Sequence, residues 1–264
     1  MKQFFNVQKK LGFGCMRLPM RDGEVDIEEM KKMVDLFLER GFNYFDTAHG
    51  YVGGRSETAL KETLTSRYPR ESYLLADKLS THFFNKAEEI RPLFESQLQA
   101  CGVDYFDFYL MHAQDANIYA KYQRLGAYEI AYGFKAEGKI KHFGISFHDR
   151  AEVLEKILSE HPEIEVVQIQ FNYADYEDQS VESRKVYEVC EKYDKAVVVM
   201  EPIKGGSLLN LPETAQKIYD DLGTGMSNAS YAIRFAAGFE NIMTVLSGMS
   251  SLANMEDNTG YTPY

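Results

Sequence analysis

The sequence predicts an α/β protein with one domain, folded as an eight-stranded parallel (β/α)8 or TIM barrel. The chain has 264 residues, close to the roughly 250 residues usual for such a barrel. Short β-prone runs alternate with amphipathic helical segments, which is typical of parallel strands joined by right-handed crossovers. No Pro/Gly-rich linker divides residues 1–264. An open, doubly wound sheet is the alternative, because local pattern does not reveal closure.

Eight strands and the helices between them follow in order. The predicted strands cover residues 11–16, 43–48, 73–78, 105–112, 142–147, 166–171, 196–201 and 244–249. The predicted helices cover residues 27–40, 56–67, 87–100, 121–137, 150–159, 181–193 and 213–238, with a last short helix near the end. In the first helix, Met30, Val34 and Phe37 fall on one face, and Gly41 is a natural stop. Helix 213–238 is expected to break near residues 223–225.

Composition indicates a cytoplasmic protein that binds neither nucleic acid nor membranes. The net charge is −11, which disfavours non-specific attraction to polyanions. The cysteines Cys15, Cys101 and Cys190 are far apart and form no C-x-x-C motif, which argues against a disulfide scaffold or a thiolate metal cluster. The start of the sequence is too polar for a signal peptide, and no apolar run is long enough for a membrane span. The sequence leaves the oligomeric state open.

Polar side chains stand at the carboxyl ends of several predicted strands, where the chemistry of such barrels is located. Asp46, Lys78 and His112 end the second, third and fourth strands, and Tyr51 lies in the loop after the second. Each has an ordinary structural explanation when it is taken alone. The barrel geometry nevertheless brings all four to one rim, and this convergence favours a catalytic site.

The four residue types suit proton delivery to a carbonyl oxygen. A free tyrosine has a pKa near 10, and a nearby ammonium is expected to lower the pKa of Tyr51. A shift of two units needs about 2.7 kcal/mol, which one close charge can supply. The buried ammonium of Lys78 needs a counter-ion, which Asp46 provides. His112 would orient the oxygen, and a positioned acid contributes roughly 10²–10⁴-fold in rate.

With these residues the chain resembles the aldo-keto reductase family. The resemblance covers nearly the whole chain, through the motifs LGFGCMRL, GFNYFDTAHGYVGGRSE, LADK, YFDFYLMH, GKIKHFGISFH, VVQIQFNY, VMEPIKGGSL and VLSGMSSLANMEDN. It implies a (β/α)8 barrel that binds NADPH or NADH and reduces an aldehyde or ketone. It also implies Tyr51 as general acid, Asp46 and Lys78 as its tuning pair, and His112 as the substrate orienter.

The resemblance further implies a set of cofactor-binding positions. Ser146 and Gln168 would hold the nicotinamide carboxamide, and Met200 stands where an aromatic ring usually stacks. The other expected cofactor contacts are Gly14, Met16, Arg17, Asp46, Pro202, Lys204, Gly205, Gly206, Ser207, Leu208, Ser247, Gly248, Met249, Ser250, Asn254, Asp257 and Asn258. No metal ligand is expected.

The sequence departs from the family pattern in several places. Phe147 and His148 stand where many members carry Asn, and Asn254 stands where a basic residue often marks the 2′-phosphate site. The similar branch often continues into a ferredoxin-like tail with iron–sulfur clusters, and residues 1–264 contain no such cysteines. The N-terminal hairpin of many members would be short here, covering residues 2–9.

Two other functions are considered. A metal-dependent barrel hydrolase would use ligands among His49, His112, His142 and His148, although Lys78 would repel a cation. A non-enzymatic module that binds the dinucleotide and senses redox state would keep the fold without turnover.

Overall fold

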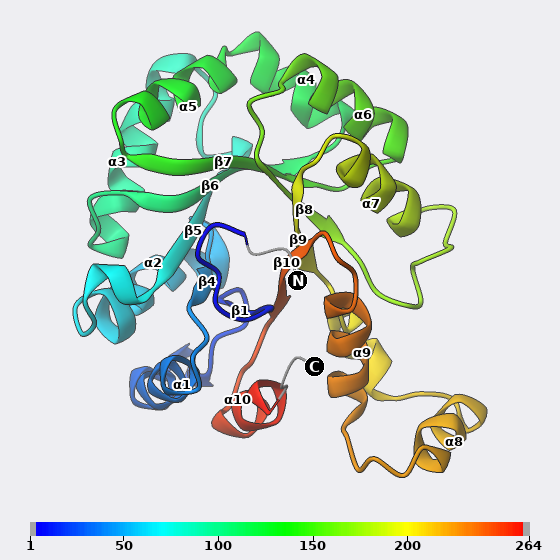
Figure 1. Ribbon diagram of the computed structural model, residues 1–264. Coiled ribbons are helices and arrows are strands. Elements are labelled where there is room, and N and C mark those ends of the chain that lie inside the picture. Colours follow the sequence, from blue (N-terminus) through cyan, green and yellow to red (C-terminus); the bar gives the residue numbers. More distant parts are fainter. Residues whose placement is uncertain (1–3, 261–264) are drawn as a thin grey trace.

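The computed structural model describes residues 4–260 and shows eight parallel strands in a closed barrel with helices around it (Figure 1). The barrel strands are β1 (Leu11–Gly14), β4 (Tyr44–Asp46), β5 (Leu74–Leu79), β6 (Phe106–Gln114), β7 (Ile140–Phe147), β8 (Val166–Gln170), β9 (Ala196–Met200) and β10 (Ile242–Ser247). Strand β10 pairs with β1, with Gly12 opposite Leu246, so the sheet has no edge. The predicted barrel is confirmed, and the open-sheet alternative is wrong.

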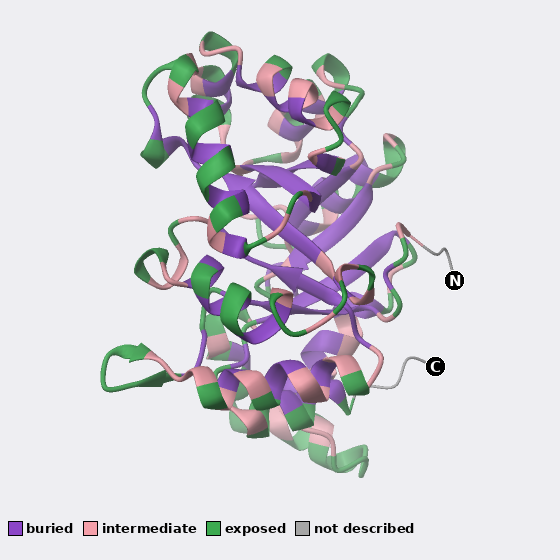
Figure 2. Cartoon of the chain, turned by 90° about the vertical axis from the view of Figure 1, so that its left-hand side faces the viewer, coloured by how far each residue is buried: buried purple, intermediate pink, exposed green. Residues whose placement is uncertain are grey.

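Helices cover the outside of the barrel. They are α1 (Ile27–Glu39), α2 (Ser56–Leu60), α3 (Ile90–Cys101), α4 (Ala116–Arg124), α5 (Ala127–Ala136), α6 (Ala151–Glu160), α7 (Ser183–Lys192), α8 (Glu213–Asp221), α9 (Asn228–Ala237) and α10 (Leu252–Thr259). Figure 2 shows buried strands inside and helices whose outer faces are exposed. Helix α1 shows why such a segment is helical and packs against the barrel. Asp26 caps its first turn by accepting from the Glu29 N–H at 3.1 Å, and the apolar stripe of the helix is buried.

Two predicted helices differ in the structure. The segment 121–137 is two helices, α4 and α5, because Gly126 adopts a left-handed conformation (φ 60°) that interrupts the helical path. The segment 56–67 begins as α2 and continues as a π-helical turn, Lys61–Thr65. The predicted break in the region 213–238 is confirmed, and it separates α8 from α9.

The floor of the barrel is closed by the chain before β1. Val7 is buried together with Tyr44, Phe108 and Val198 inside the barrel, and Phe4 and Phe5 pack against this cluster. Residues 4–9 form a turn without a strand, so the expected hairpin is wrong over these residues; residues 2 and 3 lie outside the described part. Because this end is filled, the cavity with the polar side chains opens at the opposite end.

A small hairpin between β1 and α1 was not predicted. Its strands, β2 (Met20–Arg21) and β3 (Glu24–Val25), have only two residues each. Gly23 forms the turn between them with φ +84°. Strands this short leave no alternation in the sequence by which they could be recognised.

Candidate active site

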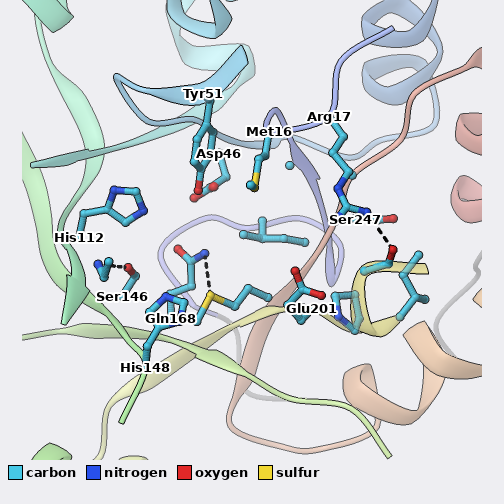
Figure 3. A pocket seen from close by; sticks show the side chains of 18 residues that line it. Met16, Arg17, Asp46, Tyr51, His112, Ser146, His148, Gln168, Glu201 and Ser247 are labelled. Carbon is cyan, nitrogen blue, oxygen red and sulfur yellow. Dashed lines mark hydrogen bonds between the residues drawn. The ribbon is translucent and has the colours of Figure 1, made fainter. Parts of the chain in front are cut away.

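A cavity of about 380 Å³ lies at the carboxyl ends of the barrel strands (Figure 3). Tyr51 and His112 stand at one end of it and Arg17 and Ser247 at the other. The predicted residues that line it are Gly14, Met16, Arg17, Asp46, Tyr51, His112, Ser146, Gln168, Met200, Pro202, Gly205, Ser247 and Gly248. Residues from almost every barrel strand, or the loop after it, therefore meet in one cavity.

Asp46 and Lys78 form a buried ion pair beside this cavity. Lys78 Nζ donates to Asp46 Oδ1 and to the Thr47 carbonyl, each at 2.6 Å. The Lys78 side chain is 0% exposed and that of Asp46 3%. Burial lowers the pKa of Lys78, but the Asp46 carboxylate and Tyr51 raise it more, so the pKa lies above its ordinary value. Lys78 is therefore a fixed cation held by its counter-ion.

Tyr51 begins a short turn, Tyr51–Gly54, after β4. Val52 and Gly53 both have left-handed backbone conformations, with φ 53° and 65°. Lys78 Nζ lies 4.9 Å from the centroid of the Tyr51 ring. Burial raises the pKa of the phenol and the Lys78 ammonium lowers it, with a balance above the ordinary value of 10.0. The expectation that the pKa of Tyr51 is lowered is wrong. It was based on the Lys78 ammonium alone, and burial raises the pKa by more than the ammonium lowers it.

His112 faces Tyr51 from β6, with ring centroids 6.0 Å apart and the rings nearly perpendicular. A bulge follows it, with Ala113 at φ 55°, and breaks the register with β7. Ser80 Oγ lies 2.6 Å from His112 Nδ1. Burial, followed by the charge of Lys78, lowers the pKa of His112 to about 3. The imidazole is therefore neutral near pH 7.

The amide of Gln168 lies beside Ser146, on the His112 side of the cavity (Figure 3). Its Nε2 donates to Met200 Sδ at 3.7 Å, while its buried Oε1 has no hydrogen-bond partner among the described residues. Ser146 Oγ, nearby, accepts from the Ala113 N–H at 2.7 Å and keeps its own proton to donate. A buried acceptor without a partner costs free energy, so these two residues fit a ligand amide group.

Glycines and one arginine form the other end of the cavity. Arg17 Nη1 donates to the Gly205 carbonyl at 3.1 Å, and Gly205 has φ +64°. A Cβ on Gly248 would lie 3.5 Å from Arg17 Cβ, and one on Gly14 would lie 3.4 Å from the Ser247 carbonyl oxygen. Arg17 is the only lysine or arginine among the described residues that line this cavity. Close backbone approach and one cation suit an anionic, phosphate-bearing ligand.

Several predicted cofactor positions do not line the cavity. Lys204 forms an ion pair with the fully buried Asp175, and Met249 and Leu208 are buried. The others outside it are Gly206, Ser207, Ser250, Asn254, Asp257 and Asn258. Two of them form hydrogen bonds with residues that line the cavity. Asn258 Nδ2 donates to Ser247 Oγ at 2.9 Å, and Ser250 Oγ donates to the Arg17 carbonyl at 3.0 Å.

Five lining residues were not assigned to the site from the sequence: Ala113, His148, Glu201, Ile203 and Leu246. Four of them directly follow or flank strand ends that were assigned, so widening each assignment by one or two residues would have found them. His148 was considered from the sequence as a possible metal ligand and as a departure from the family pattern, but not as a residue of this site.

The alternative of a metal site finds no support in the described chain. Among residues 4–260, no group of three or more His, Cys, Asp or Glu side chains is arranged to hold a metal ion. His49 Nδ1 contacts Glu57 at 3.0 Å, and His142 Nδ1 contacts Glu165 at 3.0 Å. Nor does any helix within these residues have the length and apolar character needed to cross a bilayer.

The fold and the site together define a (β/α)8-barrel protein with a Tyr–Lys–Asp–His cluster at the carboxyl end of its strands. The chain belongs to the aldo/keto reductase family, whose model matches residues 10–263.

Individual relatives are distant. The chain is 25% identical over 222 residues to the NADH-specific methylglyoxal reductase of Escherichia coli K12, an alignment covering 75% of this chain and 65% of that protein. The chain thus spans just under two thirds of that relative's length. It resembles the holo form of an aldo-keto reductase from Bacillus halodurans with a TM-score of 0.73, 21% identity, and coverage of 100% and 91% of the two chains. A Klebsiella pneumoniae aldo-keto reductase in complex with NADPH gives a TM-score of 0.72, 16% identity, and coverage of 96% and 89%.

Proposed function

We propose that this protein is an oxidoreductase that reduces an aldehyde or ketone with NADPH or NADH. The observation that carries the proposal is the convergence of Asp46, Tyr51 and His112 on one cavity, with Lys78 buried next to Asp46 and Tyr51. Lys78 holds Asp46 at 2.6 Å and lies 4.9 Å from the Tyr51 ring, and Tyr51 faces His112 at 6.0 Å. The family match and the NADH-specific relative in Escherichia coli support the same function.

The cavity fits a nicotinamide dinucleotide. Gln168 Oε1 would accept from the carboxamide N–H, and Ser146 Oγ would donate to its oxygen. Met200 would lie against the nicotinamide ring, where a thioether makes favourable contact. Arg17 and the glycines around it would hold the phosphates. Ser250, Asn254, Asp257 and Asn258 stay predictions for the adenosine end. When bound, the reduced cofactor supplies the hydride.

Tyr51 would supply the proton. Its raised pKa keeps the phenol protonated in the resting protein, as an acid must be. Negative charge that grows on the carbonyl oxygen pulls the proton across, and the fixed ammonium of Lys78 stabilises the phenolate that remains. Neutral His112, whose Nδ1 is engaged by Ser80, would direct Nε2 toward the same oxygen and orient the substrate. Asp46 keeps Lys78 charged and in place.

A cofactor titration followed by a carbonyl screen tests the proposal. We expect saturable binding of NADPH or NADH by the full chain, and loss of nicotinamide absorbance when an aldehyde or ketone is added. Binding without turnover over a broad carbonyl panel would contradict the reductase and support the redox-sensing alternative. Absence of binding would contradict both. A cytoplasmic location and lack of nucleic-acid binding also stay predictions.

A further inference from the structure

Two carboxyl groups that the proposed mechanism does not use are buried side by side behind the site. Glu57 on α2 is 1% exposed and Asp77 on β5 is 0% exposed, and their side chains are hydrogen-bonded to each other. Such a bond needs a proton on at least one of the two groups, because an ionised carboxylate only accepts. Two like charges this close in a buried site cannot both form readily. The pair therefore holds at least one proton.

The pair connects the loop that carries Tyr51 to the strand that carries Lys78. His49, two residues before Tyr51, contacts both oxygens of Glu57, with its Nδ1 at 3.2 and 3.0 Å. On the other side, Asp77 Oδ1 accepts from the Lys78 backbone N–H at 2.7 Å. Successive residues of a strand point to opposite faces, so Asp77 lies behind the strand whose front carries the Lys78 ammonium. A continuous chain of contacts thus runs from the Tyr51 loop to the backbone of Lys78.

The helix and strand packed around the pair hold it in place. Cys101 Sγ on α3 donates to Asp77 Oδ2 at 3.8 Å. Gln97, also on α3, is hydrogen-bonded to Glu57, donates to the Lys78 carbonyl at 3.0 Å and accepts from the Tyr109 hydroxyl at 2.6 Å. The titratable and charged groups that face the pair are His49 and Tyr51 from the loop after β4, Lys78 on β5, Cys101 on α3 and Tyr109 on β6.

The charge of the pair acts on Tyr51. After burial and the Lys78 ammonium, the charges of Asp46 and Asp77 also influence the pKa of Tyr51, and both raise it. Burial, and then the charge of Glu57, raises the pKa of Asp77 well above its ordinary value, so Asp77 keeps its proton near pH 7. Burial raises the pKa of Glu57 to about 7. The pair is therefore neutral below about pH 7 and carries a negative charge above it.

From these observations we propose that Glu57 and Asp77 are positioning residues, which tie the Tyr51 loop to the strand of Lys78 and, while protonated, keep negative charge away from the phenol. This inference rests on the proposed function. Neither residue lines the cavity of the site, so both act through Tyr51 and Lys78. Loss of the Glu57 proton places a buried negative charge behind Lys78, where it opposes the phenolate that forms when Tyr51 gives up its proton.

The first test measures the single-turnover rate of cofactor oxidation between roughly pH 5 and 8, with cofactor and carbonyl substrate saturating. The wild-type rate should fall as the pH rises through about 7, where Glu57 loses its proton. Glu57→Gln cannot ionise and should show a level rate over this range. The matched control is Glu165→Gln, which changes a second His–Glu pair, with His142 Nδ1 3.0 Å from Glu165, and should keep the wild-type pH dependence.

The second test removes the connection itself. Glu57→Ala should lower the single-turnover rate roughly tenfold to 10²-fold at every pH in this range, because a small displacement of a reacting group is costly. The dissociation constant of the cofactor should stay at the wild-type value, since Glu57 does not line the cavity.

Infrared difference spectroscopy tests the pair without turnover. As the pH of the wild-type protein rises through about 7, the absorption of a protonated carboxyl group should disappear, and this change should be missing in Glu57→Gln.

Three results would overturn the inference. One is a rate that depends on pH in the same way in the wild-type protein and in Glu57→Gln. Another is a wild-type rate in Glu57→Ala. The third is an infrared change that is absent from the wild-type protein or persists in Glu57→Gln. Failure of the wild-type protein to oxidise cofactor with any carbonyl compound would instead refute the proposed function, and the infrared change would still show whether the pair holds its protons.

Discussion

Removing the negative charge of Asp46 should destabilise the fold strongly, because Lys78 is completely buried. In Asp46→Asn, the ammonium keeps its place next to the Thr47 carbonyl but loses the only counter-ion found within 4 Å of it among residues 4–260. Lys78 must then remain an unpaired buried cation or give up its proton. Both outcomes raise the free energy of the folded state relative to the unfolded state.

The magnitude follows from the geometry. Two unit charges 2.6 Å apart attract with about 6 kcal/mol at an effective dielectric constant of about 20. Desolvation of the pair offsets much of this attraction, and breaking a buried pair usually costs about 3–5 kcal/mol. We therefore expect Asp46→Asn to lose about 3–5 kcal/mol of unfolding free energy near pH 7. That is a large share of the roughly 5–15 kcal/mol typical of a folded domain.

Equilibrium urea unfolding, followed by circular dichroism, measures this loss. The double variant Asp46→Asn with Lys78→Met should recover part of it, because no unpaired charge remains, and the two changes should be coupled by about 1–3 kcal/mol. Lys217→Met breaks the exposed pair with Asp221 and serves as control, with an expected loss below about 0.5 kcal/mol. A loss in Asp46→Asn no larger than in this control would refute the reasoning, and additivity in the double variant would refute the assigned coupling.

Three further predictions concern the surrounding residues. Burial raises the pKa of Glu57 from its ordinary 4.5 to about 7, so the folded state binds a proton that the unfolded state has already released. Stability should therefore fall as the pH rises from 4.5 to about 7. Glu57→Gln should flatten the dependence of the urea midpoint on pH over this range. A pH dependence as steep as that of the wild-type protein would contradict this prediction. The NMR signal of the His112 ring should not titrate between roughly pH 5 and 8, since its pKa is about 3, and a transition within that range would show that the imidazole becomes charged. Gln168→Ala should weaken nicotinamide cofactor binding about tenfold, or about 1.4 kcal/mol. The control Gln216→Ala, on α8, should leave the dissociation constant at the wild-type value. Calorimetric titration measures both constants, and equal affinities in the two variants would show that Gln168 does not bind the cofactor.

The barrel could be predicted from the sequence because parallel strands covered by helices are apolar along their whole length, as β9 (Ala196–Met200) shows. Helix ends were harder to predict. The apolar pattern continues through Leu125, and only the left-handed conformation of Gly126 shows where α4 and α5 separate. The two-residue strands of the β2–β3 hairpin were too short to leave a pattern.

The site was predictable where position along a strand determines position in space. Asp46, His112, Ser146 and Gln168 all line the cavity because strand ends meet at one rim. Long side chains after the strands do not follow this rule. Lys204 turns to Asp175, a partner 29 residues earlier in the sequence, and nothing local indicates that pairing.

The pKa of Tyr51 shows a different limit of the sequence. Its neighbours in space were predicted correctly, and the ammonium of Lys78 does lower the pKa of the phenol. Burial acts in the opposite direction and outweighs it. The amount of burial depends on how the turn Tyr51–Gly54 packs, and no local pattern in the sequence gives that packing.

Single-turnover kinetics of Tyr51→Phe tests most directly whether the phenol delivers the proton. With a saturating carbonyl substrate and bound NADPH or NADH, the variant should bind cofactor with wild-type affinity and oxidise it roughly 10²–10⁴-fold more slowly. Oxidation at the wild-type rate would show that another group supplies the proton, and the role proposed for this cluster would then be wrong.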